Sequence, residues 1–492
     1  MISEYTPVYL PAGDRSSTPD PELMEALRGK TGNGAEGLRP QGAAEGLIAA
    51  KQRLDRGDGS RTVNSPNIKF GVYLVISILL QLTLGILFGH YYDMRIFMAT
   101  GYLVGSGQNP YITQNLTAVF QNSSFHGMTS VGYPPPWPLV LGLLYRGVVV
   151  LSPNLVLYNL VIKLPVIAAN ICLASLVVGL LKKLMVDSAT IRKAWVFMLF
   201  SPMILYFGTA WGQFDAIVAL LSLLSLVFLH RDKLPGSALL LALAIAFKPI
   251  ALPLFLVAIF YLRGKSPRQT LPYAFWFSVS LILFCALPFL MFRWDITPIL
   301  RGWNAHFTVA GGMSFMTFFE LLKDTYLLPG NWWLLGLIWI PAVGLAIIPL
   351  RQGIFGFTDL LRKSLGLILV FYLTRAWLSE PNIILILPLA LILTVTGELN
   401  PLALHALWIL PLVITVFNAS PPQLLFLNFP QAMQHLLDLW EKYRMFRLVA
   451  SSVLVIPWQA AGWWIVATCF KRVQPQIEAA RRVVNPTYKP VT

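Results

Sequence analysis

Long apolar runs separated by short basic loops constrain this chain more than any other feature. Several runs reach the length of about 20 residues that a helix needs to cross the hydrocarbon core of a bilayer. Only 12% of the 492 residues are charged, whereas soluble proteins carry about 25%. A backbone in lipid must satisfy its own polar groups, which helices do locally. The sequence therefore predicts an all-α, polytopic transmembrane bundle of about 10–13 membrane helices.

The apolar runs also set the domain organisation. Residues 1–67 are rich in Gly, Pro, Ala and mixed charges without a sustained apolar stripe, so we predict a disordered N-terminal tail. Residues 68–470 form one membrane domain, and residues 471–492 form a C-terminal tail. The predicted membrane segments are 68–90, 155–181, 193–210, 213–230, 236–248, 250–262, 271–292, 331–350, 364–378, 381–397, 402–418 and 446–470.

The basic residues indicate an orientation. The net charge of +15 does not favour nucleic-acid binding, because Lys and Arg lie in short loops rather than along one soluble face. Such loops stay in the cytoplasm. This places both termini in the cytoplasm, in the plasma membrane if the source is prokaryotic. The expected contact is anionic lipid. The basic clusters occupy 51–69, 182–193, 231–233, 263–268, 351–363 and 471–482.

This orientation has two consequences for the short segments. The stretch 137–151 cannot be an ordinary span, so it must lie along or dip into the outer face. The runs 236–248 and 250–262 must be two short helices, since the proline of Lys248-Pro249 breaks a helix. With this topology the unusual polar groups all face the extracytoplasmic side, which predicts one active cavity there.

The run from His90 to Arg95 directly follows the first apolar segment. Ionisable groups at such a position are costly, so Asp93 and Arg95 are functional candidates, with Arg95 as a substrate-binding residue. The alternative is a charged interfacial cap of the helix. Asp-Met-Arg is not an Asp-x-Asp metal motif, which favours a site without metal but leaves a divalent cation open.

Three further candidates could bind the hydroxyls of a sugar. Tyr133 precedes a stiff triple proline, and its ring could stack on a sugar face; the alternative is an aromatic belt with a rigid turn. Gln213 and Asp215 lie in a tight polar turn between two apolar runs. Their alternative role is to cap a helix start, where a carboxylate is favoured.

The remaining candidates include two cations. Lys248 could bind a phosphate, pair with an acidic side chain such as Asp215, or snorkel to the interface. Arg375 is the better phosphate ligand because its guanidinium can bind two oxygens. Glu380 could orient Arg375 or form a local ion pair with it. His306, in the predicted outer loop, is either a site residue or a solvated loop histidine.

These motifs, in this order, resemble those of GT-C integral-membrane glycosyltransferases, most closely the polyprenyl-phosphate-sugar users of family 87 and the archaeal mannosyltransferases. The resemblance covers roughly residues 70 to 400 and rests on an ordered set of short motifs. They are Tyr92-Asp93, Gly101-Tyr102, 107–111, Tyr133-Pro134-Pro135, Trp211-Gly-Gln213-Phe-Asp215, Phe247-Lys248-Pro249 and Ser379-Glu380-Pro381.

The resemblance implies a GT-C fold with a large first external loop and Asp93 as catalytic base. It also implies a single displacement with inversion, in which a hexose, with mannose favoured, leaves a polyprenyl phosphate for a lipid- or glycan-linked acceptor hydroxyl. Arg375 and Lys248 would bind the leaving phosphate. A lipid-phosphate donor requires no nucleotide or other cofactor.

Two other functions are compatible with parts of the pattern. A transporter or flippase of lipid-linked sugars would also show broken helices and charges within the membrane, but it should consist of two related halves, and no internal repeat is visible. A non-catalytic membrane scaffold would not be expected to gather its charges on one face.

Overall fold

The computed structural model describes residues 67–128, 131–151, 154–298, 300, 311–324, 335–417 and 420–471, all within the unit Pro66–Thr492. These residues are helical almost throughout, which confirms the all-α prediction. Two short strands, β1 (Gly311–Gly312) and β2 (Trp377–Leu378), pair in parallel. The predicted N-terminal tail up to residue 66, the predicted C-terminal tail from residue 472 and His306 lie outside the described residues.

The α-helices differ widely in length. Their bounds are α3 (Asn67–Leu87), α4 (Tyr91–Gly105), α5 (Thr117–Phe120), α6 (Pro136–Leu151), α7 (Leu155–Lys183), α8 (Ser188–Phe200), α9 (Asp215–His230), α10 (Leu234–Phe247), α11 (Pro253–Lys265), α12 (Thr270–Cys285), α13 (Leu287–Phe292), α15 (Thr317–Asp324), α16 (Trp339–Leu350), α17 (Gly356–Thr374), α18 (Leu387–Val395), α19 (Pro401–Phe417), α20 (Ser420–Gln423), α21 (Pro430–Lys442) and α22 (Arg444–Phe470).

Five helical segments in the described part are long and apolar enough to cross a membrane: Phe70–Leu87, Leu155–Lys183, Ser188–Trp211, Pro267–Phe292 and Arg444–Phe470. They indicate a membrane protein. Five more apolar helical segments are shorter, with 10–17 residues. A helix of 12 residues extends only about 18 Å, so the larger count of 10–13 membrane helices stays a prediction.

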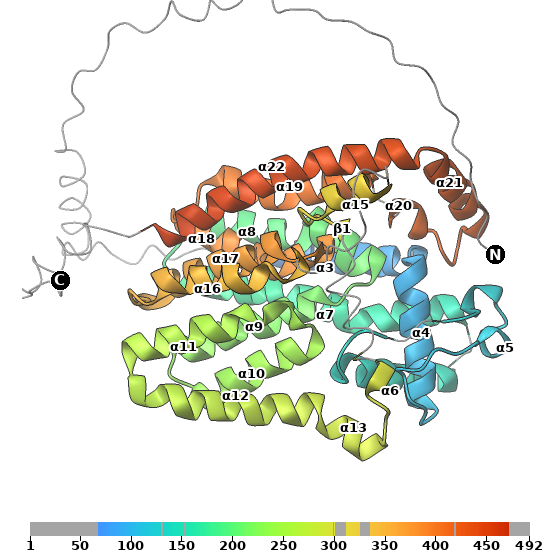
Figure 1. Cartoon of the computed structure of the whole chain (residues 1–492), viewed down its shortest axis with the longest axis horizontal. Coiled ribbons are helices and arrows are strands. Elements are labelled where there is room, and N and C mark those ends of the chain that lie inside the picture. The colour runs from blue at the N-terminus through green and yellow to red at the C-terminus, as the bar shows by residue number, and fades with distance from the viewer. Residues whose placement is uncertain are drawn as a thin grey trace, which may run out of the picture. The chain divides into compact units, whose positions relative to one another are not determined.

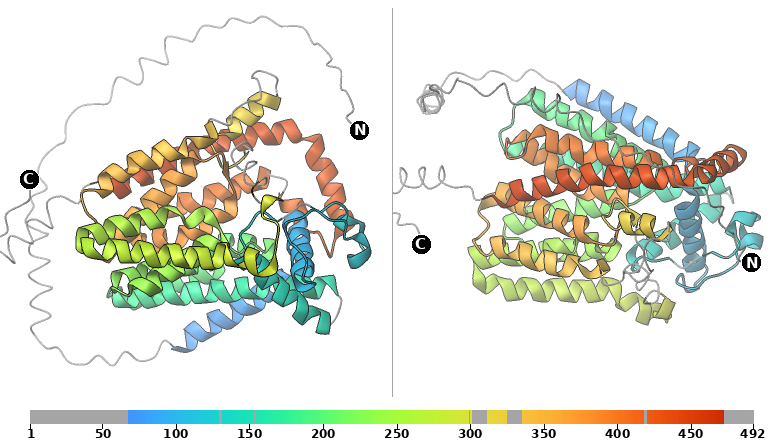
Figure 2. Two further views of the ribbon diagram at one scale, coloured as in Figure 1. Left: turned by 60° about the horizontal axis from the view of Figure 1, so that its bottom comes forward. Right: turned by 45° about the horizontal axis from the view of Figure 1, so that its top comes forward.

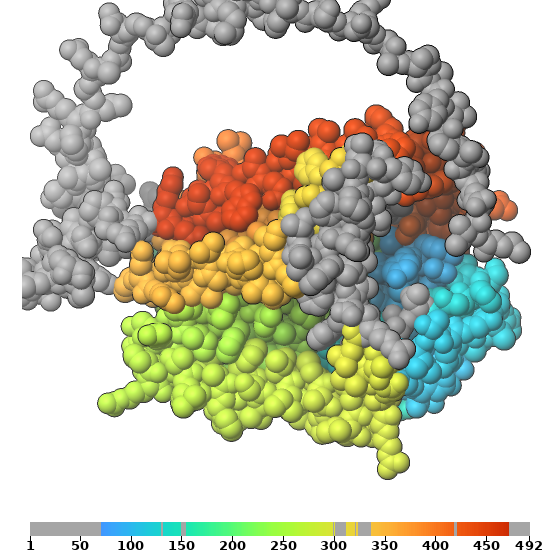
Figure 3. Space-filling model, in the orientation of Figure 1, coloured from blue at the N-terminus to red at the C-terminus, as the bar shows by residue number. Residues whose placement is uncertain are grey.

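The long helices lie side by side, and α4 crosses them at one end (Figures 1 and 2). In the space-filling view the segment from α4 to α6, coloured blue to cyan, forms that end (Figure 3). Helix α4 packs so closely against α6 that a Cβ on Gly101 would lie only 2.8 Å from the Leu141 carbonyl oxygen. Glycine therefore permits the close crossing that holds α4 in place.

The predicted break at Lys248-Pro249 is confirmed. Helix α10 ends at Phe247, Lys248 is extended with φ −154°, and a 3₁₀ turn over Pro249–Ala251 leads to α11. The residue before a proline avoids the helical region, which explains the extended Lys248. The segment 137–151 forms α6, which is not among the five long segments; its place relative to a membrane stays a prediction.

Two local features near α4 were not predicted. The first apolar helix ends at Leu87, and α4 starts anew at Tyr91, with His90 between them. Helix α8 continues into a π-helix, Ile204–Trp211, that ends at Gly212 with φ +96°. π-Helices are rare and frequently occur at functional sites. Both features bring side chains, those of His90 and Trp211, to the first turn of α4.

Candidate functional site

Asp93 lies in the first turn of α4, and His90 caps that helix. The Nδ1 atom of His90 is 3.4 Å from the backbone nitrogen of Asp93 and 3.1 Å from Asp93 Oδ2. A carboxylate at a helix N-terminus is stabilised by the helix dipole. The side chain keeps 14% of its surface exposed, so it is held in place but accessible.

Trp211, at the end of the π-helix, completes the contacts of Asp93. Its indole Nε1 donates a hydrogen bond to Asp93 Oδ2, and its ring stacks on His90 with centroids 4.0 Å apart and planes at 10°. Both neighbours thus contact the same oxygen. Neither Trp211 nor His90 contacts the other oxygen, Oδ1, and Gln213 is a further hydrogen-bond partner of the carboxylate.

The protonation state of Asp93 follows from opposing effects. Burial raises its pKa, but the hydrogen bond and charge of His90, together with hydrogen bonds from Trp211 and Gln213, lower it by more. The net pKa therefore lies below the ordinary value of 3.8. A carboxylate with a lowered pKa is ionised at neutral pH, as a proton acceptor must be.

Asp215 and Lys248 form a buried ion pair. Lys248 Nζ lies 2.9 Å and 2.8 Å from the two carboxylate oxygens of Asp215. Asp215 starts α9 and is fully buried, while Lys248 stands at the break between α10 and α11 and is 7% exposed. Of the partners considered for Lys248, the structure supplies the acidic side chain, so its charge is already balanced within the protein.

Tyr133 connects the two acidic groups. Burial raises the pKa of its phenol, and the charges of Asp93 and then Asp215 raise it further, so the hydroxyl stays protonated. Lys248 Nζ is 5.8 Å from the centre of the Tyr133 ring, which packs edge-on against Phe214 at 4.9 Å. Gln213 is a hydrogen-bond partner of this phenol, and a neutral phenol can also donate its hydrogen bond to a bound hydroxyl.

Arg375 follows the end of α17, and its guanidinium lies 5.0 Å from the centre of the Phe371 ring. Within the described ranges it makes no ion pair, so the expected local pair with Glu380 is not seen there. Tyr372, three residues before Arg375, interacts electrostatically with both Asp215 and Arg375. A guanidinium remains charged at neutral pH.

Glu380 approaches the same group from another side. It is 2% exposed and interacts electrostatically with Tyr206 of the π-helix. The Tyr206 ring lies 6.3 Å from the ring of Trp211. Glu380 therefore lies near the π-helix that ends at Trp211.

Arg95 is oriented differently from the other predicted residues. Its Nε donates to the Tyr91 carbonyl at 3.0 Å, its Nη1 donates to the Ser124 carbonyl, and its guanidinium lies 3.7 Å from the centre of the Tyr91 ring. These contacts fasten the loop at Ser124 to α4. A substrate-binding role for Arg95 therefore requires a rearrangement and finds no support in its contacts.

Three residues of this region were not predicted from the sequence: His90, Trp211 and Lys163. His90 and Trp211 were quoted within motifs, but nothing in their spacing shows that they stack on each other. Lys163 offered a clear signal, since it is a charged residue in the middle of the apolar run 155–181. Such residues are functional candidates by default.

No group of three metal-ligating side chains occurs in the part of the chain that the structure describes. The gathered acids are each engaged by a nitrogen donor, Asp93 by Trp211 and Asp215 by Lys248. The prediction of a metal-independent site stays open to experiment.

The turn at Gly212 yields a prediction about stability. A Cβ at this position would lie 2.5 Å from Met94 Cε and 3.1 Å from Lys163 Cε, at φ +96°. We expect Gly212→Ala to lower the free energy of unfolding by roughly 3 kcal/mol through strain and overpacking. Gly107→Ala is the matched control, because Gly107 has φ +76° with nothing within 4 Å. Equal losses in denaturant unfolding would contradict the steric part.

No protein-family model matches this chain, and no curated protein is significantly similar to it in sequence.

Proposed function

We propose that the protein is a membrane glycosyltransferase of GT-C type. It transfers a hexose, with mannose favoured, from a polyprenyl-phosphate donor to a lipid- or glycan-linked acceptor hydroxyl on the extracytoplasmic face, with inversion. The observation that carries the proposal is the partly exposed Asp93 carboxylate, one oxygen of which, Oδ2, is held by Trp211 and His90; its other oxygen, Oδ1, is the base in the proposed reaction.

The proposed reaction is a single displacement. The acceptor oxygen forms a bond to the anomeric carbon while the bond from that carbon to the phosphate oxygen breaks. The hydroxyl proton passes to Asp93 Oδ1, and the electron pair leaves with the polyprenyl phosphate. Negative charge grows on the phosphate in the transition state, where a fixed cation is most effective.

The contacts favour Arg375 over Lys248 as the phosphate ligand. Lys248 is neutralised by Asp215 at 2.8 Å, whereas Arg375 has no carboxylate partner among the described residues. A guanidinium can also bind two phosphate oxygens at once. Lys248 and Asp215 then have a structural role, as a buried ion pair next to the Tyr133 ring.

Replacing Arg375 tests this assignment. We expect Arg375→Met to raise the KM for the polyprenyl-phosphate donor about 10- to 100-fold, the usual effect of losing a hydrogen bond to a charged group. Initial rates at varied donor concentration measure it. Arg447→Met is the control, since the Arg447 guanidinium binds the Trp440 and Phe417 carbonyls elsewhere. A donor KM equal to that of the control would remove Arg375 from the phosphate site.

The whole proposal is tested with purified protein in lipid vesicles that contain radiolabelled polyprenyl-phosphate-mannose or -glucose and a membrane-lipid extract as acceptor. Transfer of label to a new lipid or glycan, with release of polyprenyl phosphate, is the expected result. Movement of the intact donor between leaflets without transfer would instead establish a flippase. Absence of both transfer and donor movement, with each of the two sugar donors, would contradict the proposal.

A further inference from the structure

Lys163 is a fully buried lysine in the middle of α7. Its Nζ donates to the carbonyl oxygens of Gly85 at 3.3 Å and Ala210 at 3.0 Å, and to that of Phe88. An ammonium group has three N–H donors, and these carbonyls account for all of them. Within the described residues Lys163 has no carboxylate partner, so ion pairing does not explain its burial.

The three carbonyls belong to two chain segments that lead into the site. Gly85 and Phe88 are at the end of α3, and Phe88 stands two residues before His90. Ala210 stands directly before Trp211 at the end of the π-helix. Asn159, one turn away on α7, also binds Gly85 and Phe88 at 2.8 and 2.9 Å, but in these contacts only Lys163 joins both segments.

The side chain of Lys163 also lies directly under the site turn. Its Cε is 3.1 Å from where a Cβ on Gly212 would stand, next to Met94 of α4. Unpaired carbonyls at helix ends are strong acceptors, so a cation among them holds both ends at a fixed separation. That separation, together with the hydrogen bond that the His90 backbone N–H donates to the Trp211 carbonyl at 3.4 Å, sets where the His90 and Trp211 rings stack.

We propose that Lys163 is a positioning residue that keeps His90 and Trp211 on Oδ2 of Asp93, so that Oδ1 is the oxygen that receives the proton. The inference rests on the proposed function for its catalytic meaning. Lys163 itself touches neither substrate nor the reacting atoms. Its contribution is to fix the orientation of the Asp93 carboxylate relative to His90 and Trp211.

Several other groups face Asp93 and bear on its titration. Tyr133 approaches from the loop before α6, with the Asp215–Lys248 pair behind it. Gln213 approaches from the turn before α9. Arg95 on α4 is directed to Ser124. Among the described residues Lys163 hydrogen-bonds to none of these groups, so replacing Lys163 removes none of their hydrogen bonds.

The test uses the full-length protein labelled with 5-fluorotryptophan. The Trp211 resonance is identified as the one missing from the Trp211→Phe variant. Because Trp211 Nε1 binds Asp93, its ¹⁹F shift reports protonation of that carboxyl group.

In the parent protein the shift should stay constant down to about pH 4, the ordinary Asp value. In Lys163→Met, weaker hydrogen bonds should raise the pKa of Asp93, so that the shift titrates about one pH unit higher.

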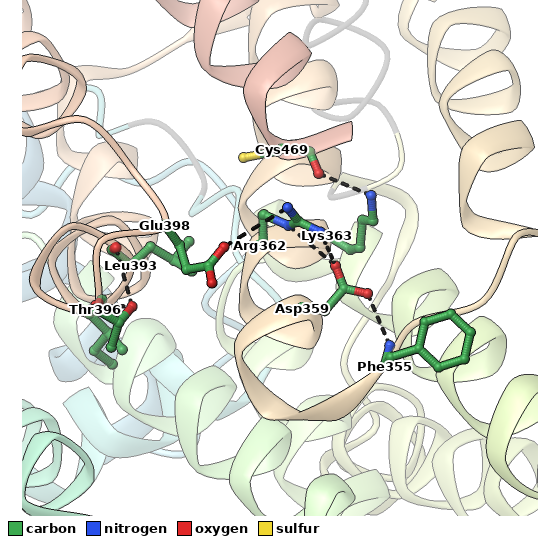
Figure 4. Close-up of polar contacts among 9 residues, drawn as sticks. Phe355, Asp359, Arg362, Lys363, Leu393, Thr396, Glu398 and Cys469 are labelled. Atoms are coloured by element: carbon green, nitrogen blue, oxygen red, sulfur yellow. Dashed lines mark hydrogen bonds and ion pairs between the residues drawn. The ribbon is translucent and has the colours of Figure 1, made fainter. Parts of the chain in front are cut away.

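The matched control lies at a different point of the bundle, where α17, α18 and α22 meet (Figure 4). Lys363 is also a buried lysine on a helix, and its Nζ donates to the Cys469 carbonyl at 3.0 Å. Its neighbour Arg362 is paired with Asp359 at 2.6 Å. Lys363→Met should lower stability without moving the Trp211 titration.

A folded Lys163→Met variant with the Trp211 titration of the parent protein would overturn the inference. If that variant does not fold, Lys163→Gln gives the same comparison with a smaller expected shift, and an unchanged titration there overturns it equally. The fluorine measurement requires no substrate. Failure of hexose transfer in the parent protein would therefore contradict the proposed function, whereas failure of the shift would contradict the positioning role alone.

Discussion

Replacing Asp93 by asparagine is expected to lower kcat for hexose transfer about 10²- to 10⁴-fold, the usual contribution of a general base. The amide has the same shape, and its oxygen can still accept the Trp211 hydrogen bond at the place of Oδ2. It cannot take up the acceptor proton. The KM for the donor should change little, because Asp93 acts on the acceptor hydroxyl.

A suitable control for this substitution is Asp187→Asn. Asp187 caps α8 by accepting hydrogen bonds from the amides of Ala189 and Thr190, both at 3.0 Å, and asparagine caps helices about equally well. Its transfer rate should match that of the parent protein. If Asp93→Asn retains more than about a tenth of the parent kcat, Asp93 is not the base, because even the weakest general base contributes more than this.

The second large effect concerns the buried pair of Asp215 and Lys248. Lys248→Met leaves the Asp215 carboxylate fully buried without its cation. Removing one partner of a buried pair costs about 3–5 kcal/mol. We therefore expect a loss of that size in the free energy of unfolding, measured by denaturant titration in detergent.

The exposed pair of Asp232 and Lys265 provides the comparison. Its Nζ–Oδ1 distance of 2.7 Å is similar, but its side chains are 49% and 39% exposed. Surface pairs contribute about 0–1 kcal/mol, so Lys265→Met should have little effect. If both lysine variants lose the same stability, burial does not govern the energy of the Asp215 pair.

The double variant Lys248→Met/Asp215→Leu separates stability from function. It removes both buried charges, so stability should largely recover. If the pair only supports Tyr133 and its surroundings, the donor KM of this variant should stay close to that of the parent protein. A large increase in the donor KM would show that Lys248 contributes to phosphate binding, as the resemblance to the GT-C enzymes implies.

Much of the fold follows from local sequence. Apolar runs of sufficient length predict membrane helices whatever their neighbours are, and the described helices fall largely on those runs. Proline after Lys248 predicts the break between α10 and α11 for a backbone reason alone. Helix α4 was missed because Tyr91–Gly105 mixes aromatic, polar and small residues and carries no strong hydrophobic pattern.

The grouping of Asp93, Tyr133, Gln213, Asp215 and Lys248 was inferred from the sequence through loop charges, and their contacts and electrostatic interactions link them in the structure. The partners of each group were not predictable. Lys248 pairs with Asp215, 33 residues away, while Arg375 does not pair with Glu380 among the described contacts, although the two are neighbours in sequence.

The sequence by itself determined where helices form and break, and which residues carry charge into apolar surroundings, because hydropathy and proline act within a few residues. The tertiary structure alone decided that Trp211, 118 residues from Asp93, holds one carboxylate oxygen, and that Lys163 joins the carbonyls before His90 and Trp211. Hydrogen bonds and ion pairs act over a few ångströms, and only the packing of distant segments brings such groups that close.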